Sequence, residues 1–168
     1  MTNNTPNHTP GLPRTVLELA TKAGVKLMTA ESCTGGMVAA ALTTPAGSSS
    51  AMWGGVVAYA NEIKQQMLGV TAEDLHTHGA VSPQVAAAMA EGAIKNSTAT
   101  LAVSISGIAG PGGATSSKPV GHVEFATFLK GDKTAQTDTK VFKGNRTEVR
   151  LQATMHALVL LKNRLEAL

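Results

Sequence analysis

The feature that most limits the fold is a set of three short apolar runs, each followed at once by small or polar residues. The runs cover residues 25–29, 56–60 and 101–106. Runs of this length, bounded by turn-forming residues, are typical of buried β-strands. The segments that accompany their ends are AESCTGG (30–36), YANEIK (59–64) and SGIAGPGG (106–113).

Helical patterns alternate with these strands. The predicted helical stretches are residues 14–24, 37–47, 61–69, 72–75, 82–97 and 145–168. Ser82 and Pro83 suit the N-cap and the first position of one helix. Asn61 suits the N-cap of another, and Asn145 with Glu148 forms the pattern of a capping box.

Two further strands are predicted at residues 121–130 and 133–143, joined as a hairpin around Gly131-Asp132. Residues 47–55 are expected to form a loop. The alternation with an added hairpin predicts an α/β fold of three layers, α/β/α, around a central mixed sheet. We expect one domain over residues 14–168, preceded by a disordered tail at residues 1–13, which are rich in Asn, Thr and Pro.

Composition excludes several classes of protein. The net charge of +3 comes from scattered basic residues and aromatics make up only 3% of the chain, which argues against a nucleic-acid partner. No apolar run approaches the roughly 20 residues of a membrane span. The single cysteine, Cys33, builds neither a disulfide nor a zinc site, and the first residues do not resemble a signal peptide. We therefore expect a cytoplasmic protein.

The segment AESCTGG places Ser32 between a strand and a helix. Ser32 is either the N-cap of that helix or a nucleophile, because Ser is a preferred N-cap residue. Gly35 and Gly36 weaken the capping interpretation, since glycine is unfavourable inside a helix. Free N–H groups at Thr34, Gly35 and Gly36 would suit a developing oxyanion.

Cys33 is the alternative nucleophile, or else a small buried hydrophobic residue. A reactive thiolate normally has a histidine partner. No spacing in the sequence links a histidine to Cys33 or to Ser32, and no Gly-x-Ser-x-Gly motif is present. A Ser-His-Asp or Cys-His enzyme is therefore not favoured.

Lys64 is the candidate base, because lysine is a known alternative partner for serine. If Asn61 caps its helix, Lys64 lies in the first turn, where the helix dipole and burial both disfavour the charged ammonium. A solvated surface lysine is the alternative. Tyr59, the one tyrosine of the chain, could orient Lys64 or relay a proton, or simply end a strand.

The glycine-rich segment at 106–113 is not followed by a helical pattern, so a Rossmann dinucleotide site is rejected. Its N–H groups could line a polar ligand, or the segment is a surface loop. Arg146 and Arg150 carry positive charge at a helix start, against the dipole preference. They suggest a phosphate or carboxylate partner, or a solvated face.

Five segments together resemble the CinA C-terminal domain family, the stand-alone nicotinamide-nucleotide amidases. They are AESCTGG, GGVVAYANEIKQQMLGV, HGAVSPQVAAAMAEGA, SGIAGPGGATSSKPVGHVEFA and FKGNRTEVR. The resemblance as a whole runs from about Arg14 to Leu165. The resemblance implies an α/β/α domain that hydrolyses nicotinamide mononucleotide to nicotinate mononucleotide and ammonia. It implies Ser32 as nucleophile with Tyr59 and Lys64 as partners, and no metal or cofactor. Larger members carry an N-terminal domain that this chain is expected to lack.

Substrate contacts are expected at Thr34, Gly35, Gly36, Asn61, Gly107, Ala109, Gly110 and Arg146. The partner would be a small nucleotide, with neither nucleic acid nor membrane involved, and a homodimer is plausible. Two other functions stay open. The chain could be a non-catalytic nucleotide-binding module linked to competence or DNA damage, or an amidase of another nucleotide.

Overall fold

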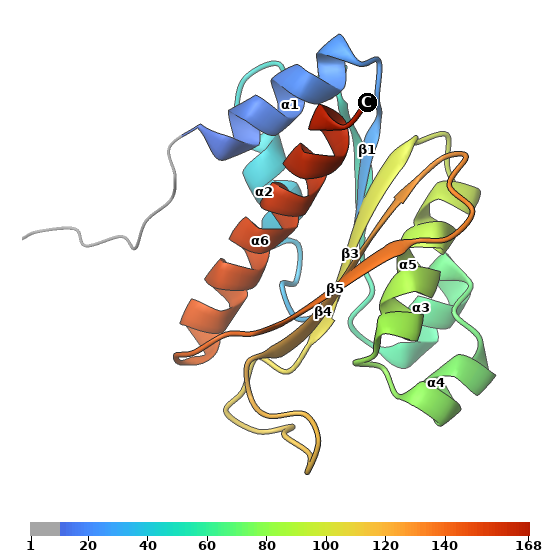
Figure 1. The fold of residues 1–168 in the computed structure, drawn as a ribbon, viewed down its shortest axis with the longest axis vertical. Helices are drawn as coiled ribbons and strands as arrows, with labels where there is room; N and C mark the ends of the chain where they lie inside the picture. The colour runs from blue at the N-terminus through green and yellow to red at the C-terminus, as the bar shows by residue number, and fades with distance from the viewer. Residues whose placement is uncertain (1–10) are drawn as a thin grey trace, which may run out of the picture.

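The computed structural model describes residues 11–168, which form a five-stranded mixed sheet with helices on both faces (Figure 1). The strands are β1 (Leu27–Glu31), β2 (Met52–Val57), β3 (Leu101–Gly107), β4 (His122–Leu129) and β5 (Gln136–Val141). Their order is β2-β1-β3-β4-β5, with β1 parallel to β2 and β3, and with β4 antiparallel to β3 and β5. The predicted three-layer α/β fold is confirmed.

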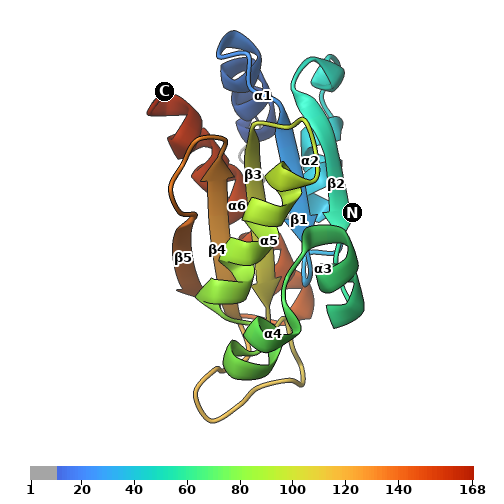
Figure 2. The ribbon, with the colours of Figure 1, turned by 90° about the vertical axis from the view of Figure 1, so that its right-hand side faces the viewer.

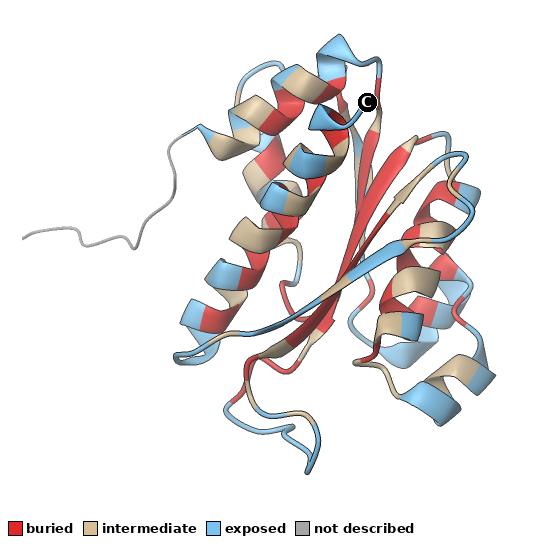
Figure 3. Cartoon of the chain, in the orientation of Figure 1, coloured by how far each residue is buried: buried red, intermediate tan, exposed pale blue. Residues whose placement is uncertain are grey.

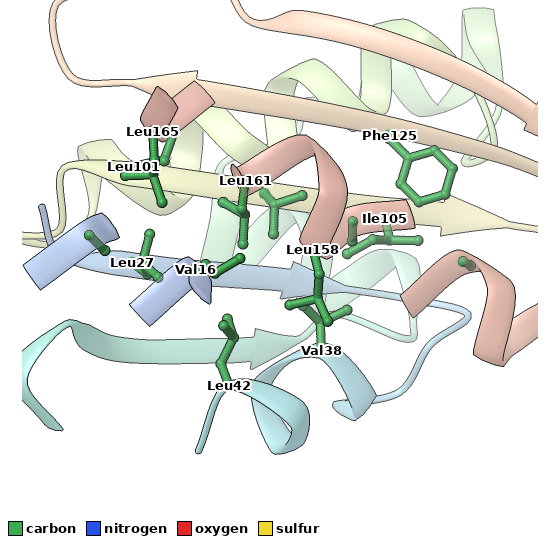
Figure 4. Packing of buried hydrophobic residues seen from close by; sticks show 14 of the residues in the cluster. Val16, Leu27, Val38, Leu42, Leu101, Ile105, Phe125, Leu158, Leu161 and Leu165 are labelled. Carbon is green, nitrogen blue, oxygen red and sulfur yellow. The ribbon is translucent and has the colours of Figure 1, made fainter. Parts of the chain in front are cut away.

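Three helices cover each face of the sheet (Figures 1 and 2). One layer contains α1 (Leu12–Lys22), α2 (Met37–Thr43) and α6 (Arg146–Glu166), and the other contains α3 (Asn61–Leu68), α4 (Ala72–His78) and α5 (Pro83–Lys95). The core beneath the first layer consists mainly of Leu, Val and Ile side chains together with Phe125 (Figure 4). Burying each such side chain contributes roughly 1.5–3 kcal/mol. The second core, beneath α5, is richer in alanine.

Local signals in the sequence explain how several helices begin and end. The Ser82 hydroxyl accepts a hydrogen bond from the Val85 N–H at 3.2 Å, which confirms it as the N-cap of α5. Asn145 and Glu148 form both hydrogen bonds of the predicted capping box. Gly69 ends α3 in the left-handed conformation that glycine adopts without strain.

The first strand lies two residues further along the chain than the predicted range 25–29. Although Val25 is apolar, its N–H donates to the Ala20 carbonyl and completes the end of α1. Glu31 is the last residue of β1 and is fully buried, a position that hydrophobic patterning does not predict for a carboxylate.

The second strand differs more from its prediction. It covers residues 52–57 rather than 56–60, so part of the predicted loop 47–55 is strand, and the 3₁₀ turn Ser48–Ser50 occupies another part. Gly54 and Gly55 interrupt the apolar pattern from which a strand is predicted. Gly55 is nevertheless required, because a Cβ atom there would overlap the Thr29 hydroxyl. Exposed and half-buried residues alternate along β2, as expected for an edge strand rather than a buried one.

Other boundaries move by a few residues. Helix α1 begins at Leu12, two residues before the predicted start at 14, because Pro13 fits the first turn of a helix. Most of the predicted tail, residues 1–10, lies outside the described residues. Helix α4 is longer than the single turn predicted at 72–75, and β5 begins at Gln136 rather than at residue 133.

Helices α3 and α5 are in very close contact at Gly92. A Cβ atom at this position would lie only 1.7 Å from the carbonyl oxygen of Leu68, the last residue of α3. Only glycine allows the end of α3 to approach α5 this closely. Residue 92 thereby sets where α3 lies on the sheet.

The carboxyl ends of β1, β2 and β3 lie at one edge of the sheet, because these strands are parallel. At this edge the buried strands give way to loops that are partly exposed (Figure 3). Ligand sites in such sheets lie at this edge. The segments that follow β1, β2 and β3 meet there.

Candidate active site

Ser32 directly follows β1, and its N–H donates to the Ile105 carbonyl of β3 at 2.9 Å. A turn at residues 33–36 then leads into α2, whose N-cap is Gly36 with a left-handed backbone. Ser32 therefore lies four residues before the cap, which excludes the interpretation of Ser32 as the N-cap. Its side chain is half-buried and free for another role.

Glu31 occupies the start of α2 with its carboxylate. Its two oxygens accept hydrogen bonds from the N–H groups of Gly36, Val38 and Ala39 at 2.9–3.1 Å. These are the donors that a helix start leaves without intrahelical partners. The Gly35 N–H donates to the Ser32 carbonyl at 3.0 Å. The expectation that Gly35 and Gly36 offer free N–H groups to an oxyanion is therefore wrong.

Two donors in this turn are free. Within the described part of the chain, the N–H groups of Cys33 and Thr34 have no acceptor, whereas every other N–H from Ser32 to Ala40 has one. The buried Thr34 hydroxyl also lacks a partner there. Backbone donors without a partner are rare inside proteins, so this pair indicates a place where another group binds.

Lys64 lies in the first turn of α3, and its side chain reaches Ser32. The Nζ atom is 3.3 Å from Ser32 Oγ, 2.9 Å from the Ala58 carbonyl and 3.2 Å from the Tyr59 carbonyl. Lys64 is only 1% exposed, so it is not the solvated surface lysine of the alternative interpretation. Asn61 is the first residue of α3 rather than its N-cap, which is Ala60, but the position of Lys64 in the first turn is as predicted.

The surroundings of Lys64 favour the neutral amine. Burial lowers the pKa of its ammonium, and no carboxylate of the described residues pairs with Nζ. A neutral amine has two N–H donors and one lone pair. The carbonyls of Ala58 and Tyr59 can take both donors, which leaves the lone pair for the Ser32 hydroxyl.

Cys33 is not suited to be the nucleophile. It is 5% exposed, and burial raises the pKa of its thiol to about 11, so the thiol stays protonated near neutral pH. Its contacts are those of the small buried hydrophobic residue of the alternative interpretation.

Tyr59 and Arg146 meet at the opening of the site. The Arg146 guanidinium donates to the Tyr59 hydroxyl at 3.2 Å and to the Gly110 carbonyl at 2.8 Å. The Tyr59 side chain is 61% exposed, and it is the backbone carbonyl of Tyr59, not the hydroxyl, that contacts Lys64. A cation therefore joins the segment after β2 to the glycine-rich loop after β3.

The remaining predicted residues have different surroundings. Gly107 packs against β4, where a Cβ atom would lie 2.7 Å from a Val123 methyl group. Ala109 is buried, Gly110 has a left-handed backbone and Asn61 is exposed. Among residues 11–168 no cluster of three His, Cys, Asp or Glu residues is placed to hold a metal ion. No helix in this part of the chain has the length and apolar character to cross a membrane.

Sequence reasoning missed Glu31 and misjudged Arg150. Arg150 Nε donates to the Cys33 carbonyl at 3.0 Å, and its Nη2 donates to the Thr34 carbonyl at 3.1 Å. It therefore contacts the backbone beside Ser32, rather than a solvated face. An acidic residue at the end of an apolar strand is a signal that could have identified Glu31. Arg150 lies 117 residues from Cys33, and no local pattern reveals that contact.

The fold and the site define an α/β domain with a buried lysine against a serine at the carboxyl edge of a mixed sheet. The model of the CinA C-terminal domain matches residues 10–165, and the chain belongs to this family. A CinA-like protein of Mycolicibacterium gilvum is 52% identical over 143 residues, which are 85% of this chain and 34% of that protein. The chain thus spans about a third of the length of the curated relatives it matches.

The structure is similar to solved structures over nearly the whole chain. The competence/damage inducible protein CihA of Agrobacterium tumefaciens superposes with a TM-score of 0.90 at 42% identity, covering 98% of this chain and 99% of that one. A CinA superfamily protein of Klebsiella pneumoniae gives a TM-score of 0.91 at 36% identity, covering 96% and 100%. The expected family and fold are therefore confirmed.

Proposed function

We propose that this chain is a serine–lysine amidase that hydrolyses the carboxamide of nicotinamide mononucleotide to nicotinate mononucleotide and ammonia, in pyridine nucleotide recycling. The observation that carries the proposal is the Lys64 amine, buried and 3.3 Å from the Ser32 hydroxyl. A buried lysine with a lowered pKa is one of the bases that activate a serine. The choice of amide rests on the family resemblance of the sequence.

In the proposed reaction, neutral Lys64 takes the Ser32 proton while Oγ attacks the carboxamide carbon. The free N–H groups of Cys33 and Thr34 stabilise the oxyanion, in place of those of Gly35 and Gly36. The Lys64 ammonium then returns the proton to the leaving nitrogen, and ammonia departs. Water hydrolyses the acyl-enzyme, with Lys64 again acting as base, and releases the acid.

Arg146 would hold the phosphate of the substrate. It joins the glycine-rich loop to Tyr59 at the opening of the site, and it has no carboxylate partner among the described residues. A guanidinium suits a phosphate, because its fork of donors matches the phosphate oxygens. Nicotinamide riboside, which lacks the phosphate, should therefore be a far poorer substrate. Equal catalytic efficiency for riboside and mononucleotide would exclude this role.

The test is ammonia release from nicotinamide mononucleotide and from a panel of other amides. Ser32→Ala should reduce turnover at least ~10³-fold, whereas Cys33→Ala should keep most of it. Turnover of a different nucleotide amide would indicate the alternative amidase, and nucleotide binding without any turnover would indicate a binding module. Loss of activity only in the Cys33 variant would overturn the choice of nucleophile. Light scattering of the purified chain would test the expected dimer.

A further inference from the structure

The side chain of Arg150 contacts the turn that follows Ser32 from the helix layer that also contains α2. It extends from α6, and its two donors hold the consecutive carbonyls of Cys33 and Thr34. Gly35 makes room for this contact, since a Cβ atom there would lie 3.2 Å from Arg150 Nη2. One planar side chain thus fixes the peptide unit between Cys33 and Thr34 and the unit between Thr34 and Gly35.

Because the peptide bond is planar, a contact that fixes a carbonyl also fixes the direction of the N–H group in the same peptide unit. The C=O and N–H of a trans peptide unit point in opposite directions. Because Arg150 holds the Cys33 carbonyl toward α6, the Thr34 N–H of the same unit points away from α6. Helix α3, which carries Lys64, covers the opposite face of the sheet from α6 (Figure 1). The preceding unit is fixed as well, since its carbonyl, that of Ser32, accepts the Gly35 N–H.

The charge of Arg150 acts in the same direction. Its hydrogen-bond partners are carbonyl oxygens, and no carboxylate within residues 11–168 forms an ion pair with it. No ion pair therefore cancels its positive field, although the Glu31 carboxylate at the same turn opposes it. A positive charge behind the turn favours negative charge that develops in front of it.

We propose that Arg150 is a positioning residue that aims the N–H groups of Cys33 and Thr34 at the oxyanion of the reaction. The inference rests on the proposed serine hydrolase function, and it does not depend on nicotinamide mononucleotide as the substrate. Arg150 itself does not touch the reacting atoms. Its contribution should therefore fall on the chemical step and not on substrate binding.

The main experiment compares Arg150→Lys with the matched control Arg146→Lys, one helical turn away on α6. Lysine keeps the charge but cannot hold two carbonyls with one planar group. Arg150→Lys should lower kcat by about 10²–10³-fold, the loss expected when an oxyanion donor is removed. Its KM should stay within about twofold, and the midpoint of its pH–rate profile, set by Lys64, should not move. Arg146→Lys should mainly raise KM.

A second readout uses no nucleotide. Acylation of Ser32 by p-nitrophenyl acetate, followed by nitrophenolate release and by mass spectrometry of the acetylated peptide, also passes through an oxyanion. Arg150→Lys should slow this step by a similar factor. Adding guanidinium chloride at low millimolar concentration to Arg150→Ala should restore part of the rate, and methylammonium should not. Thermal melting would verify that each variant is folded.

The outcomes separate the two proposals. If p-nitrophenyl acetate acylates Ser32 of the native chain but the chain does not hydrolyse nicotinamide mononucleotide, the substrate assignment fails. The acylation rates then decide the role of Arg150. A folded Arg150→Lys variant with rates within threefold of the native values would overturn the proposal. So would a rise in KM that accounts for the whole loss. If neither compound acylates Ser32 of the native chain, both proposals fail together.

Discussion

Two buried ionisable side chains lie at the same edge of the sheet, and their hydrogen-bond partners differ. Glu31, 0% exposed, ends β1 on the side covered by α2, and Lys64, 1% exposed, reaches the next residue of the chain from α3. Three backbone N–H groups surround the carboxylate. Two backbone carbonyls and one serine hydroxyl surround the amine.

Burial of an ionisable group therefore does not by itself identify a catalytic group. All three partners of Glu31 are peptide groups, which cannot exchange protons with it, so Glu31 holds the start of α2 in place. Lys64 has one partner that can lose a proton. The difference in function follows from that partner and from the lowered pKa of the lysine.

Lys64→Arg and Lys64→Met should show the largest effect. Both variants should lose at least ~10²-fold in kcat, because arginine cannot deprotonate near neutral pH and methionine has no base. The native rate should rise with pH through an ionisation below that of free lysine, near 10.4. Steady-state ammonia release between pH 6 and 10 measures both. Substantial activity in Lys64→Arg would make Tyr59 the next candidate base.

Lys64→Met also tests how Lys64 affects stability, separately from its effect on activity. Since the pKa of Lys64 is lowered on folding, the unfolded chain binds more protons, and Lys64 makes stability rise with pH between its folded pKa and about 10.4. Lys64→Met should lack this rise and be at least as stable as the native chain at neutral pH. Chemical unfolding at several pH values tests this, and a strongly destabilised methionine variant would contradict it.

Glu31→Gln should show the reverse pattern, a loss of stability. An amide presents an NH₂ group to N–H donors that now bind oxygen, so we expect the free energy of unfolding to fall by about 2–3 kcal/mol. Urea unfolding measures the loss, with Glu62→Gln, on the exposed start of α3, as the control. An unchanged midpoint would show that the carboxylate does not support α2.

The thiol of Cys33 should be unreactive. Because burial raises its pKa to about 11, Cys33 should resist Ellman's reagent at pH 8 in the folded chain and react at once in urea. Cys33→Ala should lose only about 1 kcal/mol of stability, as for a small side chain removed from a core. Rapid labelling of the folded chain would contradict the assignment of Cys33 as a core residue.

The smallest effect is expected at a partly exposed charge. Burial would raise the pKa of Asp138, but the hydrogen bond from His156 at 2.6 Å and the nearby Lys140 outweigh it and lower the pKa. The stabilisation is present above the unfolded pKa, near 3.9, and is lost as pH falls through the folded one. Asp138→Asn should lose at most about 1 kcal/mol at pH 7, and this difference should shrink as the pH falls below about 3.9. A loss as large as that of Glu31→Gln would remove the distinction between buried and exposed charges.

Much of the fold is encoded locally and could be predicted. The cap at Ser82, the capping box at Asn145 and the stop at Gly69 each depend on residues within one helical turn. Strand β2 was misplaced because Gly54 and Gly55 interrupt the apolar pattern, and Gly55 is explained only by its close approach to Thr29, on another strand. Periodicity carries no information about such a contact.

The central pair of the site could also be predicted from the sequence, but the donors around it could not. Ser32 and Lys64 stand out because each follows a strand and faces a helix start, and the structure brings them together. The donors around Ser32 could not be assigned correctly, because Glu31 and Arg150 decide which N–H groups stay free. Assigning them requires the three-dimensional positions of both side chains.

The close contact at Gly92 has a consequence for how this chain can change over evolution. Alanine is the better helix former by roughly 1 kcal/mol, so selection for stability alone would favour replacing this glycine inside α5. The added methyl group would overlap the last carbonyl of α3 and push that helix outward, and Lys64 would move with it. Proton transfer requires its two atoms within hydrogen-bond reach. The absence of a Cβ atom at Gly92, 28 positions after Lys64 in the sequence, thus restricts which mutations the protein can accept.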